Sequence, residues 1–195
     1  MQSNSLAKLT GVVLAGGKSQ RMGTDKAALQ WQGSSLLKSR FTLLETALNT
    51  ECYVSGHYPG FRHIKDSNES MGPLSGLHSC LQALPEQFCL FVPVDMPLLN
   101  EPVLDFMINH HRIKPGNYYC SNSVFPIIVE ANENNLRCLS EVLSLPVAKQ
   151  RSIKAFLNLI QATELDLPKE FESALVNTNT PEQWQSIKDK VGEQQ

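Results

Sequence analysis

The chain has 195 residues, of which 42% are hydrophobic and 18% are charged. Its 17 Lys and Arg residues nearly balance its 19 Asp and Glu residues, for a formal net charge of −2 at pH 7. This length suits one domain with a substantial core, and the composition excludes intrinsic disorder. The charge balance argues against a protein that wraps duplex nucleic acid, because such binding depends on a basic surface.

The sequence carries no sign of membrane insertion or secretion. Apolar runs such as residues 88–94 are far shorter than the roughly 20 residues that a membrane-spanning helix needs. Residues 1–8 lack the apolar segment and cleavage site of a secretory leader, so we expect a cytoplasmic protein. The five cysteines are consistent with a cytoplasmic protein, because their odd number and wide spacing predict neither a disulfide framework nor a zinc site.

Apolar runs predict the strands. Residues 10–15 form a short apolar run that contains several β-branched residues and stops at a pair of glycines, which is typical of a strand buried on both faces. Residues 88–94 are the most apolar segment and are expected to form the central strand. Pro93 cannot donate a ladder hydrogen bond, so pairing must end or bulge there. The other expected strands cover residues 52–55, 62–65, 118–124 and 126–130.

Apolar residues at helical spacing predict the helices. The last helix is marked by its start, where Thr180 can act as a cap, Pro181 suits the first turn and Gln183 completes a capping box. It should run to about Val191. The other expected helices cover residues 35–49, 101–112, 133–145 and 151–161, together with one that opens at residues 71–76.

Strands that alternate with helices, without repeats or linkers, predict a single α/β domain. We expect a doubly wound, mostly parallel sheet with helices on both faces, formed by residues 10–191 between a stub of residues 1–9 and a tail of residues 192–195. Ligands of such sheets bind beyond the carboxyl ends of the strands. These ends are Ala15, Ser55, Asp66 and Asp95.

The segment after the first expected strand points to phosphate chemistry. Gly16 and Gly17 let a ligand approach the backbone closely, and such loops present N–H groups to phosphate. The spacing fits neither the dinucleotide fingerprint nor the Walker A motif. The alternative is a flexible turn with solvated charges. The basic residues that could neutralise a triphosphate are Lys18, Arg21 and Lys26.

Acidic residues follow two of the expected strands. Asp95 comes directly after the most apolar one, where a carboxylate could hold a hard cation that bridges phosphates. An Asp before Met-Pro also starts turns, so a turn cap is the alternative. Asp66 has the same alternative, an Asx turn with Ser67, and Asp25 is interpreted as a cap that orders the preceding loop.

The pattern A-G-G-x-x-x-R-M-G-x-D-K at residues 15–26 resembles the signature of the nucleotidyltransferases that make sugar nucleotides and cofactors. Within that superfamily the chain is most similar to the molybdenum cofactor guanylyltransferase family, and the similarity extends from residue 10 to residue 184. Other motifs follow in the family's order. They are D-S at 66–67, G-P-L-S-G at 72–76, P-V-D-M-P at 93–97 and N-T-N-T-P at 177–181.

The resemblance implies a role for each matched position. Lys26 and Arg21 would bind the phosphates of GTP, and Asp95 would ligate Mg²⁺, so these three are the implied catalytic residues. Asp66 would lie in the guanine-nucleotide site, near a looser match at Ser55. The implied nucleotide-binding residues are Leu14, Ala15, Gly16, Gly17, Lys26, Ser55, Asp66 and Asp95.

The implied reaction transfers GMP from Mg-GTP to molybdopterin-bound molybdenum, with release of pyrophosphate. It needs no nucleophilic side chain, because the attacking group is the terminal phosphate of the pterin. Magnesium, Lys26, Arg21 and the loop amides would align two anions and offset their repulsion. The resemblance also implies transient contact with proteins that deliver the cofactor and with molybdoenzymes, but no nucleic acid or membrane.

The part of the chain that is expected to bind the acceptor resembles the family less closely. Relatives commonly carry a His-Pro pair where this chain has Phe125 before Pro126. Residues 151–154 could contact the pterin phosphate, or could be a solvated helix start. Three alternatives therefore stay open: a cytidylyltransferase for the same pterin, a transferase for another phosphorylated acceptor, and a nucleotide-binding regulator without turnover. Gly16-Gly17 modestly favours guanylyl transfer over cytidylyl transfer.

Overall fold

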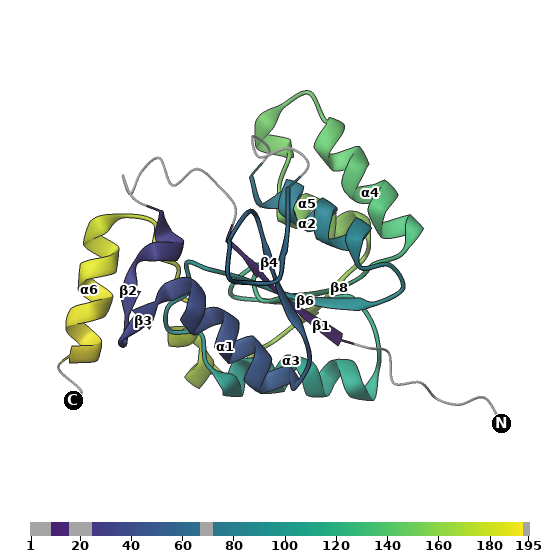
Figure 1. The fold of residues 1–195 in the computed structure, drawn as a ribbon. Coiled ribbons are helices and arrows are strands. Elements are labelled where there is room, and N and C mark those ends of the chain that lie inside the picture. The colour runs from purple at the N-terminus through teal and green to yellow at the C-terminus, as the bar shows by residue number, and fades with distance from the viewer. Residues whose placement is uncertain (1–8, 16–24, 67–71, 193–195) are drawn as a thin grey trace.

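One seven-stranded sheet, in the order β5-β4-β1-β6-β8-β7-β9, carries helices on both faces (Figure 1). The structure is a computed structural model that describes residues 9–15, 25–66 and 72–192. It confirms the predicted α/β fold. The strands are β1 (Leu9–Leu14), β4 (Cys52–Ser55), β5 (His63–Ile64), β6 (Phe88–Pro93), β7 (Tyr118–Cys120), β8 (Ile127–Glu130) and β9 (Thr163–Leu165).

The sheet is mostly parallel, as expected. Strands β5, β4, β1 and β6 all run in one direction. Strand β8 is antiparallel to both β6 and β7, and β9 pairs in parallel with β7. The carboxyl ends of β1, β4, β5 and β6 therefore meet at one edge, where an open α/β sheet binds ligands.

Strand β6 lies at the centre of the sheet, and all six of its residues are buried. Pairing with β1 continues through Pro93, because the next residue, Val94, donates its N–H to the Leu14 carbonyl at 3.0 Å. On the other side, pairing with β8 stops at Phe91 opposite Ile127. The ladder with β8 thus ends two residues before Pro93, and the expected end of pairing at Pro93 is wrong on the β1 side, where β6 continues toward Asp95.

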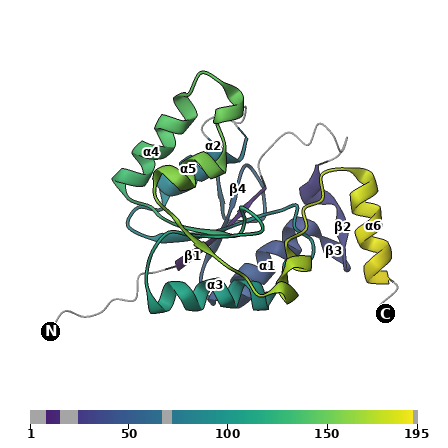
Figure 2. The same cartoon turned by 180° about the vertical axis from the view of Figure 1, so that it is seen from behind.

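The helices form two layers (Figures 1 and 2). Residues of α1 and α3 belong to one apolar cluster, and residues of α2, α4 and α5 belong to a second cluster on the opposite face. Side-chain caps start several of these helices, as in α1, where Ser35 accepts from the Lys38 N–H at 3.2 Å. The helices are α1 (Leu36–Leu48), α2 (Pro73–Ala83), α3 (Glu101–Ile113), α4 (Glu133–Ser144), α5 (Ile153–Leu159) and α6 (Pro181–Gly192).

Helix α6 lies at one end of the molecule beside a small hairpin of β2 (Gln30–Trp31) and β3 (Ser34–Ser35) (Figure 2). The expected capping box is present, since Gln183 donates its N–H to Thr180 Oγ1 at 3.3 Å and accepts from the Thr180 N–H at 3.2 Å. The rings of Trp31 and Trp184 lie 5.5 Å apart and join the hairpin to the helix. This contact brings the C-terminal segment back to the N-terminal half.

Several expected boundaries were wrong. Strand β7 ends at Cys120 instead of residue 124, and α5 ends at Leu159, two residues before the expected end. The hairpin, β9 and the 3₁₀ helix η4 (Lys169–Leu175) were missed, because each is short or only partly buried. In the part of the chain that the structure describes, no helix is long and apolar enough to cross a membrane.

Candidate active site

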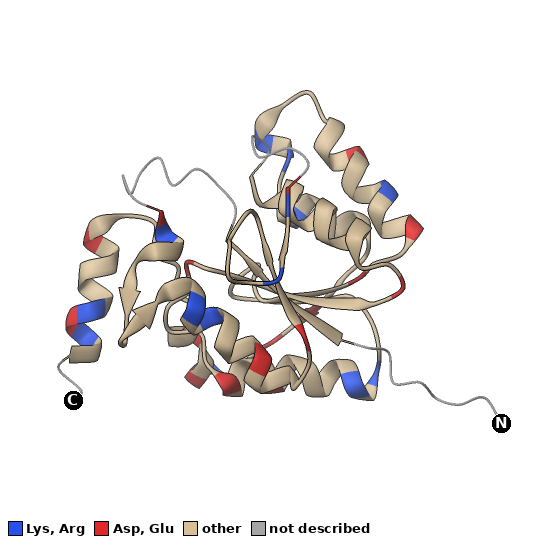
Figure 3. Cartoon of the chain, in the orientation of Figure 1, with Lys and Arg blue, Asp and Glu red and all other residues tan. Residues whose placement is uncertain are grey.

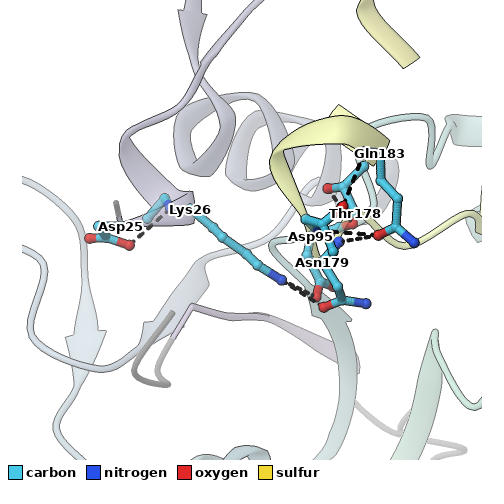
Figure 4. Close-up of polar contacts among 8 residues, drawn as sticks. Asp25, Lys26, Asp95, Thr178, Asn179 and Gln183 are labelled. Carbon is cyan, nitrogen blue, oxygen red and sulfur yellow. Dashed lines mark hydrogen bonds and ion pairs between the residues drawn. The ribbon is translucent and has the colours of Figure 1, made fainter. Parts of the chain in front are cut away.

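Lys26, Asp95 and Asn179 meet at the carboxyl edge of the sheet (Figure 4). The Lys26 Nζ lies 3.0 Å from Asp95 Oδ2 and donates to Asn179 Oδ1 at 2.8 Å. The side chains of Lys26 and Asp95 are 14% and 22% exposed, so the ion pair is partly shielded but open to a ligand. The structure thus brings together two of the three residues that the resemblance implied as catalytic.

A short turn presents Lys26. Asp25 caps the 3₁₀ helix η1 (Lys26–Ala28), because its Oδ1 accepts from the Ala27 N–H at 3.0 Å. Ala27 is 3% exposed and anchors the turn in the core, so the Lys26 side chain extends toward Asp95 and Asn179 (Figure 4). The interpretation of Asp25 as a local cap is confirmed.

The C-terminal segment holds Asp95 from the other side. The fully buried Thr178 donates its N–H to the Asp95 carbonyl at 2.8 Å, and its Oγ1 donates to the same oxygen at 3.2 Å. The adjacent Asn179 donates its N–H to Gln183 Oε1 at 2.7 Å. The N-T-N-T-P motif therefore connects the end of β6 to the start of α6.

Arg40 supports the segment that follows Asp95. It lies on α1, is 5% exposed, and donates from Nη1 to the carbonyl of Met96 at 3.0 Å and to that of Leu99. Burial lowers the pKa of its guanidinium to about 10. A buried cation that donates to two carbonyls fixes this loop, because either acceptor left alone in the core is costly.

Ser55 and Asp66 form a second polar pair, at the ends of β4 and β5. The Ser55 Oγ, which is fully buried, donates to Asp66 Oδ1 at 2.8 Å. Gly76 of α2 leaves room for both, because a Cβ on Gly76 would lie 2.4 Å from Ser55 Oγ and 3.5 Å from Asp66 Oδ1. The G-P-L-S-G motif thus packs directly against this pair.

The remaining expected residues are only partly described. The Leu14 carbonyl accepts from Val94, and the Ala15 carbonyl accepts from the Tyr58 hydroxyl at 3.0 Å. Gly16, Gly17 and Arg21, together with Lys18, lie outside the described residues.

Three contacts of the structure were not predicted from the sequence. The N-T-N-T-P motif was visible, but no role followed from it, because only the fold brings Asn179 to Lys26. Tyr58 lies in a connection that carries no recognised motif. Arg40 lies on the amphipathic helix α1, and the sequence alone does not indicate that its side chain is buried.

The cation site that the resemblance implies rests on Asp95. Among the described residues, no group of three His, Cys, Asp or Glu side chains could hold a metal ion alone. Magnesium is commonly bound by one or two carboxylates, with water and substrate phosphates completing the shell. A single carboxylate beside an amide oxygen, as Asp95 and Asn179 provide, fits this mode of binding and not a preformed metal cage.

Near the expected acceptor side, Lys154 is tied to its own neighbours. Its Nζ donates to the Tyr119 hydroxyl at 2.7 Å and lies 3.7 Å from Glu164 Oε2. The Tyr119 hydroxyl donates in turn to Glu164 at 2.6 Å. These contacts favour a structural role for Lys154 over a role in binding the acceptor. Elsewhere in the molecule, basic and acidic residues are interspersed along the helices (Figure 3).

Residues 11–164 match the MobA-like NTP transferase domain family. The chain belongs to this family and is a nucleotidyltransferase. It is 35% identical over 182 residues to the molybdenum cofactor guanylyltransferase of Xanthomonas euvesicatoria, covering 91% of this chain and 93% of that relative. A protein of the same name from Pseudomonas syringae is 27% identical over 186 residues, covering 87% of this chain and 88% of the relative.

Solved structures show the same fold. The molybdopterin-guanine dinucleotide biosynthesis protein A of Archaeoglobus fulgidus superposes with a TM-score of 0.71, covering 94% of this chain and 99% of that chain at 17% identity. A nucleotidyl transferase of Methanothermobacter has the same TM-score and identity, covering 96% of this chain and 99% of that chain. At these identities the likeness concerns the fold alone.

Proposed function

We propose that this chain transfers GMP from Mg-GTP to the molybdopterin form of the molybdenum cofactor and so forms the guanine dinucleotide and pyrophosphate. The observation that carries the proposal is the Lys26–Asp95 pair, 3.0 Å apart at the carboxyl edge of the sheet in a chain of this family. The names of the two relatives supply the acceptor and the base. We place this reaction in the cytoplasm.

Lys26 is proposed to bind the phosphates of GTP. An ammonium group has three N–H donors, and among the described residues Asp95 and Asn179 accept two of them. The third donor is proposed to bind a phosphate oxygen of GTP, beside a carboxylate that is partly exposed. Arg21 and backbone groups of Leu14, Ala15, Gly16 and Gly17 are proposed to bind the rest of the nucleotide.

Asp95 is the residue proposed to hold Mg²⁺. When bound, the cation neutralises phosphate charge and helps to orient the phosphates for displacement. Thr178 contacts the backbone carbonyl of Asp95 and not its carboxylate, whose Oδ2 lies 3.0 Å from Lys26 Nζ. Asp95 and Lys26 thus place opposite charges at one phosphate site.

The chemical step is a displacement at the α-phosphorus of GTP. An oxygen of the acceptor's terminal phosphate forms a bond to this phosphorus, the bond to the bridging oxygen breaks, and pyrophosphate leaves with that electron pair. The attacking oxygen is already anionic at neutral pH, so no general base is required. The protein contributes alignment and charge stabilisation, which can lower the barrier by several kcal/mol.

Ser55 and Asp66 are proposed to lie in the guanine part of the site. Their hydrogen bond fixes one carboxylate oxygen of Asp66, and a carboxylate suits the N–H donors on the edge of guanine. We further propose transient contact with proteins that deliver the pterin and with molybdoenzymes that receive the product.

Product analysis tests this function. Purified protein is incubated with molybdopterin cofactor, MgCl₂ and GTP, and the pterin product is identified by mass spectrometry. We expect the guanine dinucleotide from the wild type and none from Asp95→Ala, whose circular dichroism spectrum should match the wild type. A cytosine dinucleotide from CTP, or near-normal turnover by the folded variant, would contradict the proposal.

A further inference from the structure

Two imidazole rings, those of His57 and His63, face each other where β4 connects to β5. His57 Nδ1 lies 3.2 Å from His63 Nε2, and the rings meet edge to face with their centroids 4.9 Å apart. His57 is exposed and His63 is half-buried, so a solute can reach the pair. The proposed function uses neither side chain, although neutral imidazole is a common ligand of metal ions.

The backbone holds both histidines in place. His63 is the first residue of β5 and lies in register with Val54 of β4. At the other end of the connection, the Gly56 N–H donates to the Ile64 carbonyl at 2.9 Å, and His57 comes next in the chain. Because the two backbones are already fixed by the sheet, little further ordering is needed for the rings to bind one ligand together.

A backbone carbonyl sets the tautomer of His63. Its Nδ1 lies 3.1 Å from the Phe61 carbonyl, which can only accept a hydrogen bond, so Nδ1 carries the proton. The lone pair of the neutral ring is then on Nε2, the atom that faces His57. A ring N–H that donates to a backbone carbonyl is a typical outer contact of metal-binding histidines. Phe61 is itself held, because its ring packs against Phe41 of α1 with centroids 5.0 Å apart.

The separation of the two facing nitrogens suits a single bound ion. Two nitrogens at about 2.0–2.1 Å from a tetrahedral Zn²⁺ lie roughly 3.3–3.4 Å apart, close to the 3.2 Å between His57 and His63. In the free protein the same distance allows His57 Nδ1–H to donate to His63 Nε2. Since His57 is exposed, water can move its proton from Nδ1 to Nε2, and both facing nitrogens then offer a lone pair.

We propose that His57 Nδ1 and His63 Nε2 together bind one late first-row divalent cation such as Zn²⁺. Among the described residues no group of three His, Cys, Asp or Glu side chains could hold a metal ion, so water completes the coordination shell of this two-histidine site. Imidazole nitrogen suits Zn²⁺, Ni²⁺ and Cu²⁺, whereas Mg²⁺ takes oxygen ligands. The site is therefore distinct from the Mg²⁺ site proposed at Asp95.

A cation at this site would join the end of β4 to the start of β5. His57 lies two residues after Ser55, and His63 lies three residues before Asp66, so the ion would brace the connection beside the Ser55–Asp66 pair. A ligand that binds the folded chain stabilises it in proportion to its occupancy. Zn²⁺ should therefore raise the melting temperature of the protein.

The test titrates the full chain, purified without a polyhistidine tag, with ZnCl₂ against a chromophoric chelator in excess MgCl₂. We expect a single Zn²⁺ per chain, with affinity at least tenfold lower in His57→Gln and in His63→Gln, because losing even an outer contact of a metal ligand costs about 10- to 100-fold. His110→Gln is the matched control and should bind as the wild type does. Its Nδ1 also lies 3.1 Å from a carbonyl, that of Phe106, but its ring packs against Phe106 instead of a histidine.

A second measurement identifies the ligating atoms. Zn²⁺ should shift the ¹⁵N resonances of His57 Nδ1 and His63 Nε2 in the wild type, and it should raise the melting temperature of the wild type but not of the two variants. Absence of Zn²⁺ binding, unchanged affinity in either variant, or an equal loss in His110→Gln would overturn the site. These measurements need neither GTP nor the pterin, so they decide the site whether or not the proposed GMP transfer is found.

Discussion

The Lys26 ammonium donates to the Asn179 side-chain oxygen at 2.8 Å, although 153 positions separate these residues in the chain. The same ammonium contacts Asp95, and the neighbouring Thr178 binds the Asp95 carbonyl. The C-terminal segment therefore closes the site around a cation and an anion that both come from the N-terminal half. The N-T-N-T-P motif therefore belongs to the carboxyl edge of the sheet, where the candidate site lies.

Asn179→Ala removes one acceptor from Lys26 and leaves the ion pair with Asp95. Because a hydrogen bond to a charged group contributes about 1.5–3 kcal/mol, we expect kcat/KM for GTP to fall roughly 10- to 100-fold. Steady-state pyrophosphate release measures this. Asn122→Ala is the matched control, since Asn122 contacts Glu172 in an exposed position. Equal effects of the two substitutions would show that Asn179 does not act through Lys26.

Lys26→Ala removes the cation from the site altogether. We expect kcat to fall on the order of 10²-fold or more, as when one preorganised charge-stabilising donor is lost. Rapid-quench measurement of GMP transfer at saturating GTP reports the effect, with the exposed Lys188 changed to Ala as the control. A loss of thermal stability at normal kcat would mean that Lys26 only holds the turn in place.

Gly76→Ala places a methyl group against the Ser55–Asp66 pair. The new Cβ would lie 2.4 Å from Ser55 Oγ, so the pair must shift and GTP binding should weaken roughly tenfold. Calorimetric titration with Mg-GTP measures the affinity. Gly192→Ala is the control, because in the described part of the chain an added Cβ would meet no atom within 4 Å beyond its own chain neighbours and helix backbone. Wild-type affinity in a folded Gly76→Ala protein would remove this pair from the nucleotide site.

The buried cysteines predict a loss of stability in alkali. Burial raises the pKa values of Cys52, Cys89 and Cys120 from 9.0 to about 12. In the folded protein these thiols stay protonated where those of the unfolded chain ionise. The free energy of unfolding should therefore fall as pH rises from about 9 toward 12.

Urea unfolding at pH 8, 9 and 10 measures this dependence. Cys89→Ala should unfold more easily at pH 8 but show a smaller decline with pH, because one titrating thiol is gone. At pH 8 a thiol reagent should label the cysteines of the folded protein far more slowly than those of the unfolded chain. A free energy that stays constant to pH 10 would contradict the burial of these thiols as protonated groups.

Apolar patterning in the sequence was sufficient to predict most strands of the sheet. Strands β1 and β6 are buried on both faces, so their sequences are almost entirely apolar and stand out from their surroundings. Short edge elements gave a weaker signal. Strand β9 contributes one buried residue, Leu165, and a two-residue strand such as β2 has too few positions to show a period.

The candidate site was predictable where a motif coincides with the end of a strand. Asp95 was identified because it follows the most apolar segment, and Lys26 because it ends the glycine-rich pattern. The contact of Asn179 with Lys26 and that of Tyr58 with Ala15 depend on the tertiary fold. Nothing in the spacing of these residues indicates which side chains the chain brings together.

The most direct test of the proposed reaction is pyrophosphate release by the purified protein with MgCl₂ and each of GTP, CTP, ATP and UTP, with and without molybdopterin cofactor. We expect release that requires both GTP and the pterin, and that is lost in Lys26→Ala and Asp95→Ala. Release with another nucleotide, or nucleotide binding without pterin-dependent release, would contradict it.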